Sequence, residues 1–117
     1  MKRDDAVYLR HILDASVLIG RYMAGLDELS FSANSLVLDA VVRQLEVIGE
    51  ASKHVSQDLR ARHPEVPWHV ASAMRNKLVH DYMGVEPAIV WNTATTDLPE
   101  FAAQIRAVLR DIDRPTN

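Results

Sequence analysis

Cysteine is absent from the 117 residues of this chain. The absence excludes disulfide bonds and metal sites built from thiolates, and it fits the cytoplasmic location that we expect. No stretch approaches the ~18 uninterrupted apolar residues that a membrane-spanning helix requires. The first residues also lack the apolar run that follows the basic tip of a secretion signal. We therefore expect a soluble chain without a membrane anchor or a cleaved leader.

A basic excess is also missing, because 13 lysines and arginines face 16 aspartates and glutamates, which gives a net charge of −3. Proteins that bind nucleic acid by neutralising many phosphates normally carry a strong basic excess. Any contact with nucleic acid is therefore expected to be local. One short cluster of cations could provide it, and its members are Lys53, His54, Arg60, Arg62 and His63. We favour the ordinary alternative, a solvated helix end whose cations suit the helix dipole.

Strand-like alternation, internal repeats and low-complexity tracts are not found in the sequence either. Apolar residues, 48% of the chain, instead recur at steps of three and four, which is typical of amphipathic helices. The length suits one domain over residues 1–117. We predict an all-α fold, an antiparallel bundle of four main helices.

The first two helices are bounded by capping residues. The first is expected over residues 4–25, because aspartates suit its first turn and Gly25 suits its end. A short polar join at residues 31–35 offers several N-cap candidates, and a long second helix should follow to about Arg62. Gln44 interrupts the apolar face of that helix, so it needs a buried partner or a polar cavity.

Prolines bound the other two helices. Residues 63–67 form a proline-punctuated turn, after which a third helix is expected over about residues 68–82. Pro87 opens a fourth helix. Because Pro99 lacks a backbone donor, we expect a kink or a brief break in the fourth helix near Asp97.

The densest chemistry lies at residues 75–82, which read Arg-Asn-Lys-Leu-Val-His-Asp-Tyr. Arg75 offers a permanently charged fork for an anionic oxygen, and His80 can take and return a proton near neutral pH. Together they could act on a phosphodiester. Asn76 and His80 are four positions apart and share a helix face, whereas Arg75 and His80 diverge by roughly 140°.

Three arrangements could bring Arg75 and His80 to one phosphate. The arginine stem bends round the helix, the helix unwinds near His80, or a second copy of the chain supplies part of the site, which would make the protein a homodimer. The ordinary alternative for this stretch is a helix end. There a histidine in the last turn interacts favourably with the helix dipole, and Gly84 is the stop signal.

Carboxylates and other histidines raise the question of a metal. Glu46 and Glu50 are four apart and share a helix face, but a solvated face is the expectation for such a pair. His54, His63 and His69 lie around the proline turn without a helical His-Glu-x-x-His pattern, so we expect no zinc site. A metal hydrolase would require these carboxylates and histidines to converge.

The stretch at residues 75–82, written R-x4-H-x-Y, resembles the signature of HEPN domains of the HepT-like toxin family. The likeness extends over nearly the whole chain as several blocks in the right order, which are far more specific than the short motif. These blocks are Arg-Asp-Asp at residues 3–5, Arg-Gln-Leu-Glu-Val-Ile-Gly-Glu-Ala at 43–51, Arg-His-Pro-Glu-Val-Pro-Trp at 62–68, Val85 with Val90 and Trp91, and Asp-Leu-Pro at 97–99.

The resemblance implies an all-helical, usually homodimeric toxin of a type VII-like toxin–antitoxin module, whose partner is a minimal nucleotidyltransferase antitoxin of the MntA type. It also implies a metal-independent ribonuclease without a cofactor, with tRNA as the expected substrate. By the same resemblance Arg75 and His80 are catalytic and Asn76 supports the site. Tyr82 is implied as the acceptor of AMP groups, although without the resemblance an aromatic packed at a helix end is the ordinary reading. Glu86 departs mildly from the aspartate expected in many relatives.

A second interpretation belongs to another functional class. The chain could be a catalytically inert helical dimer that serves as a binding or regulatory subunit of the nucleotidyltransferase. The acidic net charge favours this interpretation, because a free ribonuclease would be expected to attract RNA. A basic cleft around paired Arg75 and His80 would favour the enzyme, whereas motif side chains buried in mutual hydrogen bonds would favour the subunit.

Overall fold

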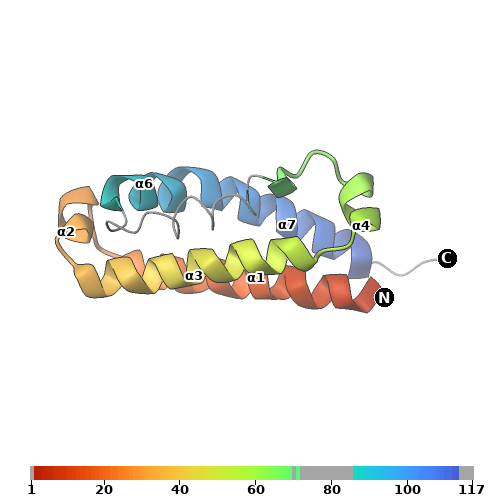
Figure 1. Ribbon diagram of the computed structural model, residues 1–117, viewed down its shortest axis with the longest axis horizontal. Coiled ribbons are helices and arrows are strands. Elements are labelled where there is room, and N and C mark those ends of the chain that lie inside the picture. Colours follow the sequence, from red (N-terminus) through yellow and green to blue (C-terminus); the bar gives the residue numbers. More distant parts are fainter. Residues whose placement is uncertain (1, 70, 72–85, 114–117) are drawn as a thin grey trace.

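The computed structural model describes residues 2–69, 71 and 86–113. All regular elements in these ranges are helical, which confirms the all-α class (Figure 1). In chain order they are α1 (Lys2–Met23), α2 (Glu28–Ser32), α3 (Ser35–His54), α4 (Gln57–Arg62), α6 (Pro87–Asn92), the π-helical turn η1 (Thr93–Asp97) and α7 (Leu98–Asp113). Most of the third helix, expected over residues 68–82, lies outside the described residues. The total of four main helices therefore stays a prediction.

Helix α1 buries apolar residues at steps of three and four, the spacing typical of an amphipathic helix. Ile12 and Ile19 are buried in the core, together with Leu9 from the neighbouring row. The helix ends at Met23, and Gly25 follows with a φ of 79°, a left-handed conformation that glycine adopts without steric cost. The predicted end of the first helix near Gly25 is confirmed.

The join expected at residues 31–35 is not simply polar, because a short helix occupies part of it. Helix α2 buries Phe31 completely, and the Phe31 ring lies 5.4 Å from that of Trp91 on α6. Asn34 then caps α3, since its side chain accepts a hydrogen bond from the Val37 backbone N–H. The N-cap prediction is confirmed, whereas Phe31 belongs to the core.

Helix α3 places Leu45 where the apolar face requires a buried side chain. Val41, Leu45 and Ile48 have no exposed surface. Gln44 lies beside this row and is only half-buried. Its side-chain amide therefore does not need a hydrogen-bond partner within the core.

The long second helix expected to reach Arg62 is wrong, because the chain breaks between α3 and α4. Val55 is extended, with φ and ψ of −67° and 136°, and Ser56 caps α4 through its hydroxyl. The break is held by Asp5 of α1, whose carboxylate accepts hydrogen bonds from the Ser56 backbone N–H at 2.8 Å and hydroxyl at 2.7 Å. The spacing of residues 35–62 could not predict this break, because Asp5, which stabilises it, belongs to α1.

The break expected near Asp97 is confirmed as the π-helical turn η1. Pro99 has no N–H to donate to the carbonyl four residues earlier, so regular α-helical bonding is interrupted there. The Leu98 backbone N–H donates to the carbonyl of Thr93, five residues back. Helices α6 and α7 therefore form one continuous segment with a shifted register.

Helices α1 and α3 lie side by side, and the segment from α6 to α7 runs along them (Figure 1). Helix α2 lies at one end of this bundle and α4 at the other, near the start of α1 and the end of α7. The Arg10 guanidinium and the Asp113 carboxylate, 3.4 Å apart, join those two helices. Among the described helices, none is both long and apolar enough to cross a membrane.

Candidate functional site

The four residues predicted to form the site, Arg75, Asn76, His80 and Tyr82, lie outside the residues that the structure describes. Their arrangement, and the dimer that would combine two copies, stay predictions. The described residues form a different feature of chemical interest, on the exposed side of the contact between α1 and α3.

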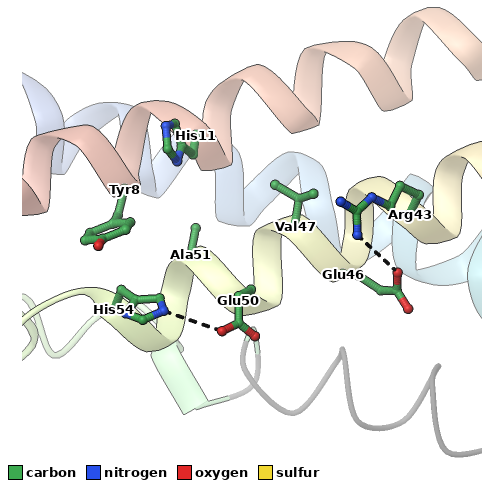
Figure 2. A pocket seen from close by; sticks show the side chains of 8 residues that line it. All are labelled: Tyr8, His11, Arg43, Glu46, Val47, Glu50, Ala51 and His54. Carbon is green, nitrogen blue, oxygen red and sulfur yellow. Dashed lines mark ion pairs between the residues drawn. The ribbon is translucent and has the colours of Figure 1, made fainter.

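This feature is a trough of about 530 Å³ between α1 and α3 (Figure 2). In Figure 2 Tyr8 points from α1 toward α3, and Val47 and Ala51 point from α3 toward α1. The lining side chains are Tyr8 and His11 from α1, and Arg43, Glu46, Val47, Glu50, Ala51 and His54 from α3. We call it the α1–α3 trough.

Aromatic rings form one end of the α1–α3 trough. The Tyr8 and His54 rings stack with centroids 5.1 Å apart and planes 20° apart. His11, one turn after Tyr8 on α1, meets the Tyr8 ring edge-on with centroids 6.2 Å apart. The Tyr8 ring also packs against the core, so its position is set by the helix contact.

Charged groups line the rest of the trough. His54 Nε2 lies 3.4 Å from a Glu50 carboxylate oxygen, and an Arg43 guanidinium nitrogen lies 3.9 Å from Glu46. Both pairs join residues three or four apart on α3, the spacing at which helical side chains meet. The trough thus combines a planar aromatic surface, one cation and two carboxylates, which suits binding a planar polar ring better than bond cleavage.

The carboxylates and histidines do not converge as a metal hydrolase would require. Glu46, Glu50 and His54 share the trough, yet no three such ligands within the described ranges are placed to hold a metal ion. His63 instead has its Nδ1 3.3 Å from Glu65. His69 is exposed.

The cations of the cluster at residues 53–63 differ in their surroundings, because some contact the protein backbone and others are exposed to solvent. Arg60 donates hydrogen bonds to the carbonyls of Ser52 and Val55, at the C-terminal end of α3. Lys53 and Arg62 are exposed. Arg60 thus satisfies free helix-end carbonyls, as the alternative of cations at a helix end predicted.

The stacked Tyr8–His54 pair and the role of Asp5 were missed by sequence analysis. His54 had been placed in a cation cluster, and nothing in the sequence pattern links it to Tyr8. The Tyr8 and His54 rings meet only because α1 packs against α3. The one local signal was that Tyr8 and His11 lie one helical turn apart.

A family model described as ribonuclease HepT-like matches residues 12–108. A probable ribonuclease HepT of Thermococcus cleftensis is 39% identical over 101 residues, which cover 86% of this chain and 92% of that protein. A protein of Caldanaerobacter subterraneus subsp. tengcongensis, named as a candidate RNase, is 36% identical over 103 residues, which cover 88% of this chain and 92% of the relative.

A longer relative comes from Methanocaldococcus jannaschii and is named as a gamma-glutamylcyclotransferase and candidate RNase. It is 32% identical over all 117 residues of this chain, which span about half of its length, 53%. No solved structure gives a significant match.

Proposed function

Because this chain belongs to the HepT-like ribonuclease family, we propose that it is a metal-independent endoribonuclease and the toxin of a type VII-like toxin–antitoxin module in the cytoplasm. The observation that carries this proposal is the family match over residues 12–108, which includes the R-x4-H-x-Y stretch at 75–82. The all-helical fold of the described residues is compatible with it. The proposed substrate is RNA, with tRNA as the first candidate.

Cleavage of RNA without a metal requires a base and a cation. His80 takes the proton of the 2′-hydroxyl, and the 2′ oxygen forms a bond to phosphorus. The bond to the 5′ oxygen breaks, that oxygen gains a proton from solvent, and a 2′,3′-cyclic phosphate remains. Arg75 stabilises the charge that builds on the phosphate, and Asn76 orients the imidazole or the phosphate. Proton transfer of this kind typically contributes about 10²–10⁴-fold to the rate.

A homodimer would bring two copies of the motif to one cleft, which would resolve the angle of roughly 140° between Arg75 and His80 on a single helix. Light scattering on the purified protein should therefore give twice the chain mass of 13.1 kDa. A monomer at all concentrations that still cleaves RNA would contradict the shared cleft.

The decisive experiment is cleavage of total tRNA in the presence of a chelator by the wild type, Arg75→Ala and His80→Ala. We expect both substitutions to abolish cleavage. Lys77→Ala is the matched control, because it removes a cation from the same stretch without touching a proposed catalytic group. Cleavage that survives both substitutions would refute the assignment.

Neutralisation would come from an MntA-type nucleotidyltransferase that transfers AMP from ATP to Tyr82. The phenol oxygen loses its proton and bonds to the α-phosphorus of ATP, and pyrophosphate leaves. The added phosphate brings negative charge that competes for Arg75, and the nucleotide fills the cleft. Intact-mass spectra after incubation with the antitoxin and ATP should show AMP on the wild type and none on Tyr82→Phe. Tyr22→Phe is the control, and equal modification of all three proteins would contradict the acceptor assignment.

A second candidate function is an inert dimeric subunit that binds and regulates the nucleotidyltransferase. The net charge of −3 favours it, because such a chain does not attract RNA over long distances. The absence of cleavage by an intact dimer, with retained binding to the nucleotidyltransferase, would establish this function in place of the first.

A further inference from the structure

We propose that the α1–α3 trough binds one unpaired nucleobase of the RNA substrate, a base that carries an exocyclic amino group. Tyr8 and His54 supply the stacking surface, and the Glu50 carboxylate supplies the acceptor. The inference rests on the proposed function, which requires RNA as the substrate, and it assigns part of the recognition of that RNA to residues outside the 75–82 stretch.

The aromatic end of the trough suits a planar ring. Tyr8 is held by the core, and its ring lies nearly parallel to that of His54. About half of the His54 side chain is exposed, 52%, so a third ring can continue the stack from the open side. Proteins that bind single strands use aromatic side chains in this way, because every base has a π-face.

The Glu50 carboxylate selects among the bases. Ionised carboxylates only accept hydrogen bonds, and the amino groups of cytosine, adenine and guanine are donors, whereas uracil has no exocyclic amino group. Glu50 lies one turn before His54 on α3 and beside the stack, with a carboxylate oxygen 3.4 Å from His54 Nε2. Glu46 lies one turn further away, next to Arg43. The trough should therefore prefer cytosine over uracil, two pyrimidines of similar size.

The charges of the trough orient the RNA strand, with the base at the His54 end and a phosphate at the Arg43 end. Phosphate is disfavoured beside Glu50, at the stacked end of the trough. Arg43 lies at the opposite end from His54 (Figure 2), and its guanidinium can attract a phosphate because 71% of its side chain is exposed, although one of its nitrogens lies 3.9 Å from Glu46. Eleven residues separate Arg43 from His54 on α3, a distance of about 16 Å. This length places a phosphate of the strand at Arg43 while the base lies at Tyr8 and His54.

The test measures binding of short oligocytidine and oligouridine strands by fluorescence anisotropy. The strands carry 2′-O-methyl groups, so they cannot be cleaved and binding is read independently of activity. Wild type should bind oligocytidine more tightly than oligouridine. Tyr8→Leu, which loses the ring, should weaken oligocytidine binding by about 5- to 100-fold, while Tyr8→Phe keeps it. Tyr22→Leu, another half-buried tyrosine of α1, is the matched control.

Glu50→Gln should remove most of the preference for cytosine, and the Glu50 side chain is 51% exposed, so the substitution does not disturb the core. Arg43→Ala should weaken oligocytidine binding but leave binding of free cytidine monophosphate unchanged. Equal binding of the two strands by wild type, or an unchanged affinity of Tyr8→Leu, overturns the proposal. A free nucleotide that binds as tightly as the strand, with no effect of Arg43→Ala, also overturns it.

The outcome separates this inference from the proposed function. Cleavage of tRNA by wild type together with no effect of Tyr8→Leu on strand binding would refute the trough alone. Binding of oligocytidine that depends on Tyr8 together with no cleavage would refute the ribonuclease and leave the trough as a base-binding site.

Discussion

Asp27 and Ser30 begin α2 with reciprocal hydrogen bonds. The Ser30 backbone N–H donates to Asp27 Oδ1 at 2.8 Å, and the Asp27 backbone N–H donates to Ser30 Oγ at 2.9 Å. The Ser30 hydroxyl also donates to Asp27 Oδ1. These bonds favour the ionised carboxyl group, the backbone bond most and the hydroxyl bond next, and they lower the pKa of Asp27.

Ser30→Ala should raise the pKa of Asp27 toward its ordinary value, because one of the two main donors is removed. A lowered pKa means that the contribution of Asp27 to stability is present above its unfolded-state pKa and is lost as the pH falls through its folded-state pKa. The variant should therefore show less acid-dependent loss of stability. A carbon-detected NMR titration of the Asp27 carboxyl checks this, with Ser32→Ala as control. An unchanged pKa in Ser30→Ala would contradict the assignment.

Asp5 acts at the scale of elements, because it fixes where α3 ends and α4 begins. Its side chain is only 4% exposed, and both carboxylate oxygens accept hydrogen bonds from Ser56. Ser56 in turn caps α4 by accepting a hydrogen bond from the Leu59 backbone N–H. One carboxylate thus links α1 to the break between two other helices.

Asp5→Ala should lower the free energy of unfolding by about 1–3 kcal/mol, because it leaves the Ser56 backbone N–H without its partner. Urea denaturation measures this change, and Asp14→Ala on the exposed side of α1 is the control. In a double-mutant cycle Asp5→Ala and Ser56→Ala should cost less together than the sum of the two. Strict additivity would show that the two residues do not act through each other.

The core contact of α3 allows a comparison within one helix. Leu45 has no exposed surface, whereas Leu36 is 80% exposed. Leu45→Ala should lower the free energy of unfolding by about 2–5 kcal/mol, because it leaves a cavity, and Leu36→Ala should change it by less than about 0.5 kcal/mol. Denaturant titrations of the two variants measure these changes. Similar losses in the free energy of unfolding would mean that Leu36 is buried in a contact in solution.

At the scale of the whole molecule, net charge limits how the protein binds RNA. A chain with a charge of −3 cannot rely on broad attraction to phosphates, so affinity must come from a few local contacts. The α1–α3 trough fits this requirement, because it has one arginine and otherwise offers stacking and carboxylate acceptors.

We therefore expect a shallow salt dependence for binding of single-stranded RNA. With one or two phosphates neutralised, the slope of the logarithm of the binding constant against the logarithm of salt concentration should be roughly −0.7 to −1.4. Anisotropy titrations at several salt concentrations give this slope. A slope steeper than about −4 would indicate a broad basic surface and would contradict local binding.

Local patterns were sufficient for much of the fold. Spacing predicted amphipathic helices, Asn34 lay in the join that offered N-cap candidates, and Pro99 located the break at η1. They were insufficient where a residue's partner is remote. The sequence placed Phe31 in a polar join, whereas the structure packs its ring against Trp91 of α6. The proposed catalytic residues came from motif resemblance, and the described residues neither support nor oppose their geometry.

The sequence by itself determined the helical class, the break near Pro99 and the family, because periodicity, prolines and motif order are properties of neighbouring residues. Only the tertiary structure decided that α3 stops at His54 and that Tyr8 stacks on His54. Asp5 and Ser56 are 51 positions apart, and the two stacked rings come from different helices. Such contacts depend on how helices face one another, which no single segment of the chain encodes.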